Sequence, residues 1–572
     1  MTLGSGWFAR RILIFWRQAS VTEGNLADKN NLATSLRDET LERLNLRIWP
    51  PAPSCLAGVL LWSVLAWASF YNLTNYPTIW WDEAIFSETA ANLVQQGRYA
   101  FTIQSPDQLS DLDFRISAGP AVILPVALAY RLLGVGVSSG RLVAGAYLVL
   151  TFLALYLGVR RLWGAAAALG AAALALVGTD VLYWGRSVLG DVPALGLFLG
   201  GTWILICGLE GHSLWPLFLG GLFLGLAFDA KEFYGLAFLP PLVVLARQSW
   251  PDKSFLARRL AAYLAGLALP LVAYLLLKVV ILGDLETAVL HFFQQKALLR
   301  HEFFTPLTIG RLYPESLGFL LGHPFFWFGL LGAGFLWKMG MSLGEQLWVA
   351  NFLLWSGVYL TSVYWYRFAL PALFLATPLA AQFIRLAVTR LARGPVRTTA
   401  WLRTGLTVTC VAALCPLTGF DLMGAICKQQ AESPLRLVDF LQKRVPTNCL
   451  IETPEYELAF LDDDHRIHLM PSYFFVESTP DRVVLFNPRE KPYDFNRVKA
   501  ELLILGSFGK SVFKTVYPPS QISREWRRIA QVDYYDIYAR RDIAWKFIPK
   551  KVLAATPKLT LPSPNRPKLA TR

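Results

Sequence analysis

Uncharged apolar residues along this chain gather in blocks of about 18–22 residues, separated by short polar connections. A helix of this length crosses the hydrocarbon core of a lipid bilayer. The pattern predicts about eleven spanning helices. Their approximate ranges are 55–71, 141–159, 165–182, 192–208, 214–229, 233–247, 260–282, 317–337, 346–362, 368–386 and 404–422. The sequence therefore predicts a polytopic α-helical membrane protein.

The apolar block Ala118–Gly134 is harder to interpret, because it is short and contains two prolines and Arg131. If it crossed the membrane, the pair Arg160–Arg161 and the basic stretch 247–259 would face outward, although basic loops tend to stay inside. We therefore expect an interfacial or re-entrant segment within a long first outer loop, residues 72–140. This assignment places the amino terminus inside and the carboxyl terminus outside.

The chain divides into four parts by composition. Residues 1–50 form a cytoplasmic segment, and residues 51–427 form the membrane domain. Residues 428–545 alternate charged and apolar stretches, which predicts a small extracytoplasmic α/β domain. The tail 546–572 is rich in proline and lysine and is expected to be disordered. The α/β domain is expected to contain a helix at Leu435–Leu441 and strands at Cys449–Glu452, Leu502–Leu505 and Asp533–Tyr538.

The overall composition agrees with membrane embedding. Hydrophobic residues make up 54% of the chain, charged residues 16%, and the mean hydropathy is +0.41. A soluble protein of this length needs more charge to cover its surface. The net charge of +14 does not indicate nucleic-acid binding. The basic residues lie mainly in short loops, where they set topology and attract anionic lipid headgroups.

The six cysteines form neither a disulfide framework nor a metal-binding spacing. Four of them lie inside apolar blocks. Cys427 and Cys449 lie downstream of these blocks, on the predicted outer side. Either a disulfide between these two or a pair of free thiols is compatible with the sequence.

Two adjacent carboxylates, Asp82 and Glu83, follow the first span directly behind Trp80 and Trp81. Residues 84–97 after them have the apolar periodicity of an amphipathic helix. Ionisable groups held at a membrane surface are costly and are often functional. The alternative is structural, because tryptophans form interface belts and aspartate caps helices.

Three further polar clusters fall on the same predicted face. The first combines Trp184, Arg186 and Asp191 just ahead of a span. The second is the run Asp229–Glu232, between two spans with almost no connecting loop, and the third is Tyr364–Arg367 at the start of another span. Each has a structural alternative, namely a helix cap, a snorkelling arginine or a mutually paired charge cluster.

Together the clusters bring carboxylates, cations and aromatic rings to one face of the membrane. This set fits sugar transfer from a lipid phosphate, with a carboxylate as general base, aromatic rings stacked on the sugar, and cations neutralising the departing phosphate. The candidate catalytic residues are Asp82, Glu83 and Asp191. The candidate phosphate ligands are Arg115, Arg186, Lys231, Tyr366 and Arg367, and the candidate sugar-stacking residues are Trp80, Trp81 and Trp184.

The order of these features resembles the GT-C superfamily of glycosyltransferases, in the branch of protein O-mannosyltransferases and bacterial 4-amino-4-deoxy-L-arabinose lipid A transferases. The resemblance covers about residues 50–385. It rests on the pair Asp82-Glu83, on Ser139–Leu142 followed by Arg160-Arg161, on Arg186 with Asp191, on Lys231-Glu232 and on Arg367–Pro371.

The resemblance implies that residues 51–427 form a catalytic membrane domain in which Asp82 is the base of an inverting transfer. Lys231 and Arg367 would bind the phosphate of a polyprenyl-phosphate sugar donor. The acceptor would be a protein or an envelope lipid or glycan. The site would lie on the outer face of the plasma (inner) membrane.

The chain also departs from the patterns of this superfamily. Glu232 and Phe368 replace the usual glycine and tyrosine, which affects the expected phosphate site more than the expected base. The second predicted outer loop carries Asp191 alone, without the Asp-x-Asp pair by which oligosaccharyltransferases of the superfamily bind a divalent metal. We therefore expect an enzyme that needs no metal or other cofactor.

Two competing classes of protein stay open. A multi-pass transporter or flippase would show internal repeats and charges near the bilayer midplane, whereas here the charges gather at one face. A receptor-like protein would place its function in residues 428–541. That stretch has no catalytic constellation of its own, and we expect it to cover the site or to help recognise the acceptor.

Overall fold

The structure is a computed structural model of the chain. It describes residues 51–79, 81–105, 108–211, 213–249, 252–303, 314–361, 366–391, 424, 426–427, 432–470, 476–479, 482–485, 493–511, 513–544 and 547. Trp80, the segment 1–50, the predicted span 404–422 and all but one residue of the predicted tail 546–572 lie outside the described residues.

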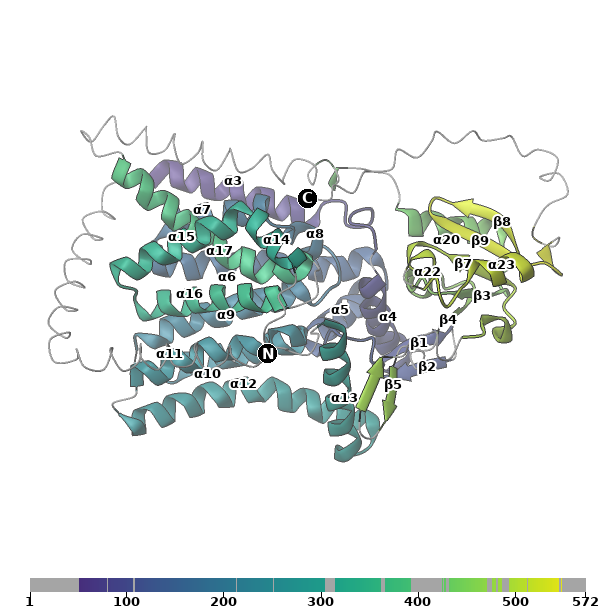
Figure 1. Ribbon diagram of the computed structural model, residues 1–572, viewed down its shortest axis with the longest axis horizontal. Helices are drawn as coiled ribbons and strands as arrows, with labels where there is room; N and C mark the ends of the chain where they lie inside the picture. Colours follow the sequence, from purple (N-terminus) through teal and green to yellow (C-terminus); the bar gives the residue numbers. More distant parts are fainter. Residues whose placement is uncertain are drawn as a thin grey trace, which may run out of the picture.

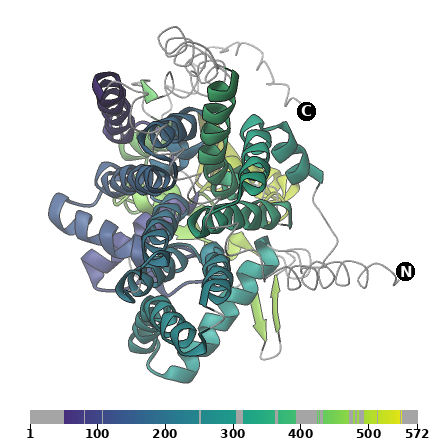
Figure 2. The same ribbon diagram turned by 90° about the vertical axis from the view of Figure 1, so that its left-hand side faces the viewer.

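Most of the described helices pack side by side in a bundle, with a β-sheet beyond one of its ends (Figure 1). The view along the bundle shows these helices end-on (Figure 2). The bundle helices are α3 (Pro51–Phe70), α6 (Val137–Trp163), α7 (Ala165–Gly178), α9 (Asp191–Leu209), α10 (Trp215–Ala230), α11 (Leu239–Ser249), α12 (Lys253–Leu282), α15 (Pro324–Met339), α16 (Leu343–Thr361) and α17 (Tyr366–Leu391). Shorter elements connect them, namely α8 (Val181–Gly185), η2 (Glu232–Phe238) and α14 (Pro314–Gly322).

Several bundle helices have the length and composition of membrane spans. Four qualify as single helices: Val137–Trp163, Asp191–Leu209, Lys253–Leu282 and Tyr366–Val388. The predicted span 317–337 is divided instead, because α14 and α15 meet at a bend of 77° where a proline starts the second helix. The described residues thus contain four spans by this measure, or five if the bent pair counts as one.

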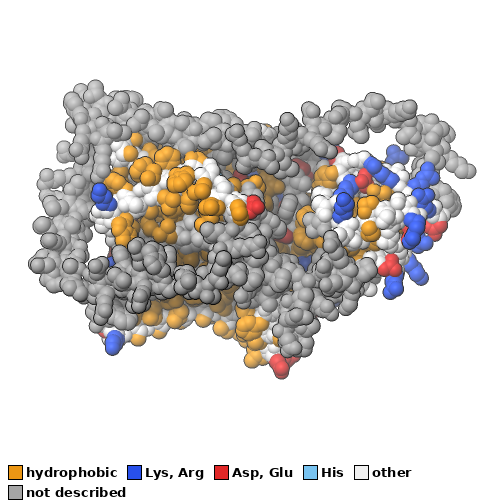
Figure 3. Space-filling view, in the orientation of Figure 1, with side chains coloured by type: hydrophobic (Ala, Val, Ile, Leu, Met, Phe, Trp, Pro, Cys, Tyr) orange, Lys and Arg blue, Asp and Glu red, His pale blue; other side chains and the backbone are white. Residues whose placement is uncertain are grey.

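The surface of the bundle is apolar. Hydrophobic side chains cover much of its visible face, whereas Lys and Arg side chains gather mainly on the sheet region (Figure 3). On α12, Leu276 and Val280 are 58% and 80% exposed, as expected for side chains that face lipid instead of water. The chain is an integral membrane protein.

Helices α10 and α12 approach each other closely because glycines face the opposite backbone. A Cβ added to Gly221 would lie 2.2 Å from the carbonyl oxygen of Tyr263, and one added to Gly266 would lie 1.9 Å from that of Phe218. A larger residue at either position would push the helices apart. Small residues allow tight association in bilayers, where the hydrophobic effect gives little driving force between helices. This contact fixes the place of Ala230, the carboxyl end of α10.

The long segment between α3 and α6 has its own secondary structure. It contains α4 (Trp81–Gln96), β1 (Ala100–Gln104), β2 (Gln108–Asp111) and α5 (Pro120–Leu133). Helix α4 corresponds to the predicted amphipathic helix. Helix α5 has 14 residues, about 21 Å of helix, which is shorter than the ~30 Å hydrocarbon core of a bilayer.

A seven-stranded mixed sheet has the strand order β2-β1-β4-β3-β7-β9-β8. Strands β3, β4 and β7 run parallel, and the other neighbours are antiparallel. Its carboxy-terminal strands are β3 (Leu450–Thr453), β4 (Arg466–Leu469), β7 (Leu502–Leu505), β8 (Trp526–Val532) and β9 (Tyr535–Arg540). The remaining elements are α13 (Leu285–Phe303), α20 (Ser433–Arg444), α21 (Glu457–Leu461), η5 (Phe495–Val498), α22 (Ser507–Lys510), α23 (Pro519–Glu525) and the separate pair β5 (Val476–Thr479) and β6 (Arg482–Leu485).

The sheet joins the two parts that sequence analysis separates. The helix and three strands expected between residues 435 and 538 are present as α20, β3, β7 and β9. Residues 100–104 and 108–111, within the predicted first outer loop, form β1 and β2, and Gln104 of β1 pairs with His468 of β4. Cys427 and Cys449 are free thiols, which removes the disulfide alternative.

Candidate active site

The centre of the site is an ion pair between two helix starts. Asp82 lies in the first turn of α4 and Arg367 in the first turn of α17. Arg367 Nη1 donates to Asp82 Oδ2 over 2.6 Å, and the Asp82 side chain is 15% exposed. The two residues are 285 positions apart in the sequence. The fold therefore brings together two of the residues that sequence analysis singled out.

Lys231 and Asp191 complete this cluster from two further helices. Lys231 is buried at the carboxyl end of α10, and its Nζ lies 4.0 Å from Asp191 Oδ2 in the first turn of α9. Its Nζ also donates to Ser117 Oγ over 3.3 Å. Gly190 makes the approach possible, because a Cβ there would lie 2.4 Å from the carbonyl oxygen of Ala230. We call Asp82, Asp191, Lys231 and Arg367 the charged cluster.

The charges in this cluster keep Asp82 ionised. Burial alone would raise the pKa of the Asp82 carboxyl, but the positive charges of Arg367 and Lys231 and the hydrogen bond from Arg367 bring that pKa below its ordinary value. An ionised carboxylate can accept a proton. Asp191 also acts on Arg367 electrostatically, so two carboxylates and two cations alternate across the site.

Aromatic rings border the charged cluster. The guanidinium carbon of Arg367 lies 6.0 Å from the ring centre of Trp184 and 5.4 Å from that of Phe368. Phe368 stacks on Phe233 at 5.1 Å, and Tyr234 lies 4.9 Å from Trp355 behind it. Trp184 is thus beside the charged cluster, as a sugar-stacking residue would be.

Glu83 has different partners from Asp82. Both of its carboxylate oxygens accept hydrogen bonds of 2.7 Å from Arg141, and Oε1 also accepts from the backbone N–H of Val188 at 3.0 Å. Arg141 donates further to the carbonyl of Leu73. Both side chains of this ion pair are at most 2% exposed. Both Glu83 oxygens thus hold α4 to α6, and a catalytic part for Glu83 stays a prediction.

Arg186, a predicted phosphate ligand, contacts backbone carbonyl groups. Its guanidinium is fully buried and donates to the backbone carbonyls of Ala68, Tyr71, Asn72 and Tyr76. These carbonyls belong to the last turn of α3 and the segment after it, where a helix leaves carbonyl groups without partners. Arg186 caps α3.

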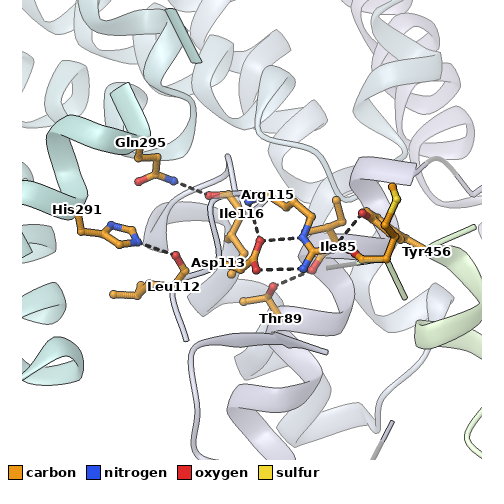
Figure 4. Close-up of polar contacts among 10 residues, drawn as sticks. Ile85, Thr89, Leu112, Asp113, Arg115, Ile116, His291, Gln295 and Tyr456 are labelled. Carbon is orange, nitrogen blue, oxygen red and sulfur yellow. Dashed lines mark hydrogen bonds and ion pairs between the residues drawn. The ribbon is translucent and has the colours of Figure 1, made fainter. Parts of the chain in front are cut away.

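Arg115 and Trp81 connect the long segment to the carboxy-terminal strands. The Arg115 guanidinium donates two hydrogen bonds to Asp113, of 2.8 and 3.0 Å, and one each to the Tyr456 hydroxyl and the Met470 carbonyl (Figure 4). Trp81 stacks on Tyr456 at 4.7 Å and on Phe508 at 4.9 Å. Arg115 and Trp81 thus link the long segment to residues 456–508, and their expected phosphate and sugar contacts stay predictions.

Tyr366 points outward. Its side chain is about half exposed, and its ring meets Phe319 of α14 edge-on at 5.0 Å. Sequence reasoning missed Arg141 and Ser117 as partners in this region, since each is a common residue type whose partner lies far away in the sequence. Only the stretch Ser139–Leu142, which carries part of the family resemblance, pointed to Arg141.

Comparison with solved structures places this arrangement in a known fold. ArnT from Cupriavidus metallidurans, bound to undecaprenyl phosphate, matches with a TM-score of 0.55 and 13% identity, over 86% of this chain and 98% of that chain. The chain has the GT-C fold. The resemblance inferred from the sequence is thereby confirmed.

Two archaeal structures support the same GT-C assignment. The Archaeoglobus fulgidus oligosaccharyltransferase in the apo form matches with a TM-score of 0.54 and 11% identity, over 80% of this chain and 70% of that chain. The oligosaccharyltransferase AglB from Archaeoglobus fulgidus, in complex with an inhibitory peptide and a dolichol-phosphate, matches with a TM-score of 0.51 and 12% identity. This match covers 86% of this chain and 75% of that chain.

Comparison of the sequence with protein-family models adds one match, which covers part of the membrane bundle. The family model for dolichyl-phosphate-mannose-protein mannosyltransferase matches residues 117–277, less than a third of the chain. This stretch contains Asp191 and Lys231 but neither Asp82 nor Arg367. No curated protein matches the sequence. Among the residues that the structure describes, no group of three or more His, Cys, Asp or Glu side chains could hold a metal ion.

Proposed function

We propose that this chain transfers a sugar from a polyprenyl-phosphate donor to an acceptor hydroxyl, with Asp82 as the general base. The observation that carries the proposal is the charged cluster, in which an ionised carboxylate lies beside two buried cations. The GT-C fold and the mannosyltransferase family model support a glycosyltransferase of this donor class. ArnT, one of the matched structures, is bound to undecaprenyl phosphate.

The proposed reaction is an inverting displacement at the anomeric carbon. The acceptor oxygen attacks that carbon as Asp82 takes the hydroxyl proton, and the bond from the carbon to the phosphate oxygen breaks. The electron pair leaves with the polyprenyl phosphate. Arg367 can serve both partners of this step, because its planar guanidinium carries five N–H donors and pairs well with phosphate as well as carboxylate.

Lys231 and Asp191 have complementary parts in this proposal. Lys231 adds a second positive charge that binds the donor phosphate before and during transfer. Asp191 Oδ2 is buried and accepts no hydrogen bond from the residues that the structure describes, although Lys231 is 4.0 Å away. A sugar hydroxyl would give this oxygen the donor it lacks. Trp184 would stack on the same sugar.

The site is proposed to face the extracytoplasmic side. Loop charge supports this orientation, since the exposed basic residues Arg160 and Arg161 lie at the opposite end of α6 from Arg141, which contacts α4. The carboxy-terminal strands then lie outside, next to the site. The acceptor is proposed to be a protein or an envelope lipid or glycan that reaches the site from that side.

Substitution of Asp82 by Asn tests the proposal. Right-side-out vesicles containing the chain receive a panel of labelled polyprenyl-phosphate sugars and an acceptor that cannot cross the membrane. We expect transfer by the wild type and a loss on the order of 10²–10⁴-fold in Asp82→Asn, because the general base is gone.

The matched control is Glu88→Gln, which makes the same chemical change on the same helix away from the charged cluster and should transfer normally. Retained transfer in Asp82→Asn would overturn the assignment of the base. Movement of labelled lipid across the bilayer without any transfer would instead favour the transporter or flippase alternative.

A further inference from the structure

A second polar cluster lies at the same end of the bundle, on α12 and α13. Lys278 of α12 is fully buried, and its Nζ donates to Gln295 Oε1 of α13 over 2.8 Å. The same Nζ lies 3.1 Å from His291 Nδ1, one turn earlier on α13. Figure 1 places α13 across the end of the bundle, beside β5 and β6. None of these three side chains belongs to the charged cluster.

The other ends of the two α13 side chains hold the loop after β2. His291 Nε2 lies 2.9 Å from the carbonyl oxygen of Leu112, and Gln295 Nε2 donates to the carbonyl of Ile116 over 3.0 Å (Figure 4). Phe114, between these two carbonyls, stacks on the His291 ring at 4.7 Å. Two backbone carbonyls and one ring thus fix residues 112–116.

The protonation state of His291 fits both of its contacts. Burial and the positive charge of Lys278 lower the pKa of His291 to about 4, although the Leu112 carbonyl and the charge of Asp113 oppose the shift. The ring is therefore neutral at pH 7. Its Nε2–H can donate to Leu112 while Nδ1 accepts from Lys278, so each atom has the role that its partner requires.

This loop leads directly to the phosphate-binding lysine. Ser117 follows Ile116, and its Oγ accepts the hydrogen bond from Lys231 Nζ. Beyond it, the backbone N–H of Ala121 donates to Asp229 Oδ2 over 2.8 Å. The loop is held by α13 before Ser117 and by α10 after it. The position of the Ser117 hydroxyl, and with it that of Lys231 Nζ, depends on both anchors.

The corner between α12 and α13 fixes the direction of α13. Gly283 ends α12 in the left-handed conformation, with φ of 95°, which favours glycine. Asp284 then caps α13 by accepting from the backbone N–H and the hydroxyl of Thr287, both at 2.7 Å. A helix that starts at a defined angle can hold a loop at a defined place.

We propose that Gln295 is a positioning residue for the donor phosphate: it holds Ile116 so that Ser117 keeps Lys231 aimed at the phosphate. The inference rests on the proposed function, because it concerns the donor of that reaction. It adds a role for α13, which lies outside the charged cluster. Gln295 does not touch the donor and acts through Ser117 and Lys231.

The test compares Gln295→Glu with Gln294→Glu on the same helix. Gln295→Glu keeps an oxygen for Lys278 but replaces the N–H group that donates to Ile116, whereas Gln294 has no part in the cluster. In Gln295→Glu we expect KM for a polyprenyl-phosphate sugar to rise about tenfold, with kcat within about twofold. Lys231 contacts the phosphate before and during transfer. Its misplacement therefore weakens binding of the donor and of the transition state equally, which raises KM and leaves kcat unchanged. Gln294→Glu should match the wild type.

A double-mutant cycle with Ser117→Ala shows whether the effect passes through Ser117. If it does, Gln295→Glu should raise KM little further in the Ser117→Ala background. Fully additive effects, or an unchanged KM in Gln295→Glu, would overturn the inference. If Gln295→Glu fails to elute as a folded protein, Gln295→Met removes the same donor without adding charge and is judged by the same criteria.

Binding of undecaprenyl phosphate, measured without turnover, separates this inference from the proposed function. We expect Kd to rise about tenfold in Gln295→Glu and not in Gln294→Glu. A wild type that binds this lipid but transfers no sugar would overturn the proposed function, and the inference would be judged on Kd alone. A wild type that does not bind the lipid would overturn both.

Discussion

Asp82 and Glu83 are neighbours in the sequence, and each pairs with a buried arginine, yet their surroundings differ. Glu83 receives two hydrogen bonds from Arg141 and one from a backbone N–H, with a side chain that is 2% exposed. Within the part of the chain that the structure describes, Asp82 accepts one hydrogen bond, of 2.6 Å from Arg367, and its side chain is 15% exposed. A saturated carboxylate stabilises a fold. A carboxylate with one partner and an open side can exchange that partner for a substrate.

The largest effect that separates the two carboxylates is on stability. Glu83→Gln leaves the fully buried Arg141 without its negative partner, and breaking a buried ion pair costs about 3–5 kcal/mol. We expect a large drop in the unfolding temperature of Glu83→Gln in detergent micelles. In Asp82→Asn we expect a much smaller drop, because Arg367 also interacts with Asp191.

For activity per folded molecule we expect the opposite ranking, with the larger loss in Asp82→Asn and the smaller loss in Glu83→Gln. Glu83→Gln protein that remains folded at low temperature should still transfer sugar, whereas Asp82→Asn should not. A Glu83→Gln variant with unchanged stability and no activity would instead place Glu83 in the catalytic set.

Glu88, a third carboxylate on α4, sharpens the contrast. It accepts a hydrogen bond from Thr102, and no Lys or Arg among the described residues forms an ion pair with it. Burial, with a smaller contribution from Asp463, raises the pKa of Glu88 to about 7, although the hydrogen bonds from Thr102 and Asn92 oppose the shift. On this one helix, Glu83 thus has both oxygens bonded to a cation, Asp82 has one oxygen bonded to a cation, and Glu88 has no ion-pair partner among the described residues.

The raised pKa of Glu88 predicts how stability changes with pH. Between pH 4.5 and about 7 the unfolded chain releases this proton while the folded chain retains it, so the wild type loses stability as the pH rises. This rise in the pKa of Glu88 corresponds to a change of about 3 kcal/mol in the free energy of unfolding. Glu88→Gln removes this titration.

We therefore expect Glu88→Gln to be close to the wild type at pH 4.5 and more stable than the wild type at pH 8. Chemical unfolding of both proteins across this pH range measures the difference. Equal pH dependence in the two proteins would mean that Glu88 is not held neutral.

Much of the charged cluster could be predicted from the sequence because its signal is local. Asp82, Asp191, Lys231 and Arg367 are each ionisable, each lies at the end of an apolar stretch, and a consistent topology places all four on one side. The helices of the bundle could be predicted from the sequence for the same reason, because an apolar stretch is a local signal. The 77° bend between α14 and α15 was not predicted, because their combined apolar length matches one straight span.

Arg186 and Trp81 could not be assigned from the sequence, because their partners carry no local signal. The partners of Arg186 are backbone carbonyls more than 100 residues earlier, and any residue type supplies a carbonyl. Trp81 beside two carboxylates is typical of a sugar platform, but its ring packs on Tyr456 and Phe508. The hairpin 100–111 was missed because it joins a sheet whose other strands follow residue 449.

The smallest expected effect concerns metal ions. Asp82 and Asp191 are each beside a cation, Arg367 and Lys231 respectively, so a divalent metal between these carboxylates would meet two positive charges as well. The same two cations can neutralise the departing phosphate, which is the work that a metal does in other phosphate chemistry. We therefore expect transfer activity to be unchanged by EDTA and by subsequent addition of Mg²⁺ or Mn²⁺. Loss of activity in EDTA with recovery on adding one of these metals would show that the cations of the charged cluster are not sufficient.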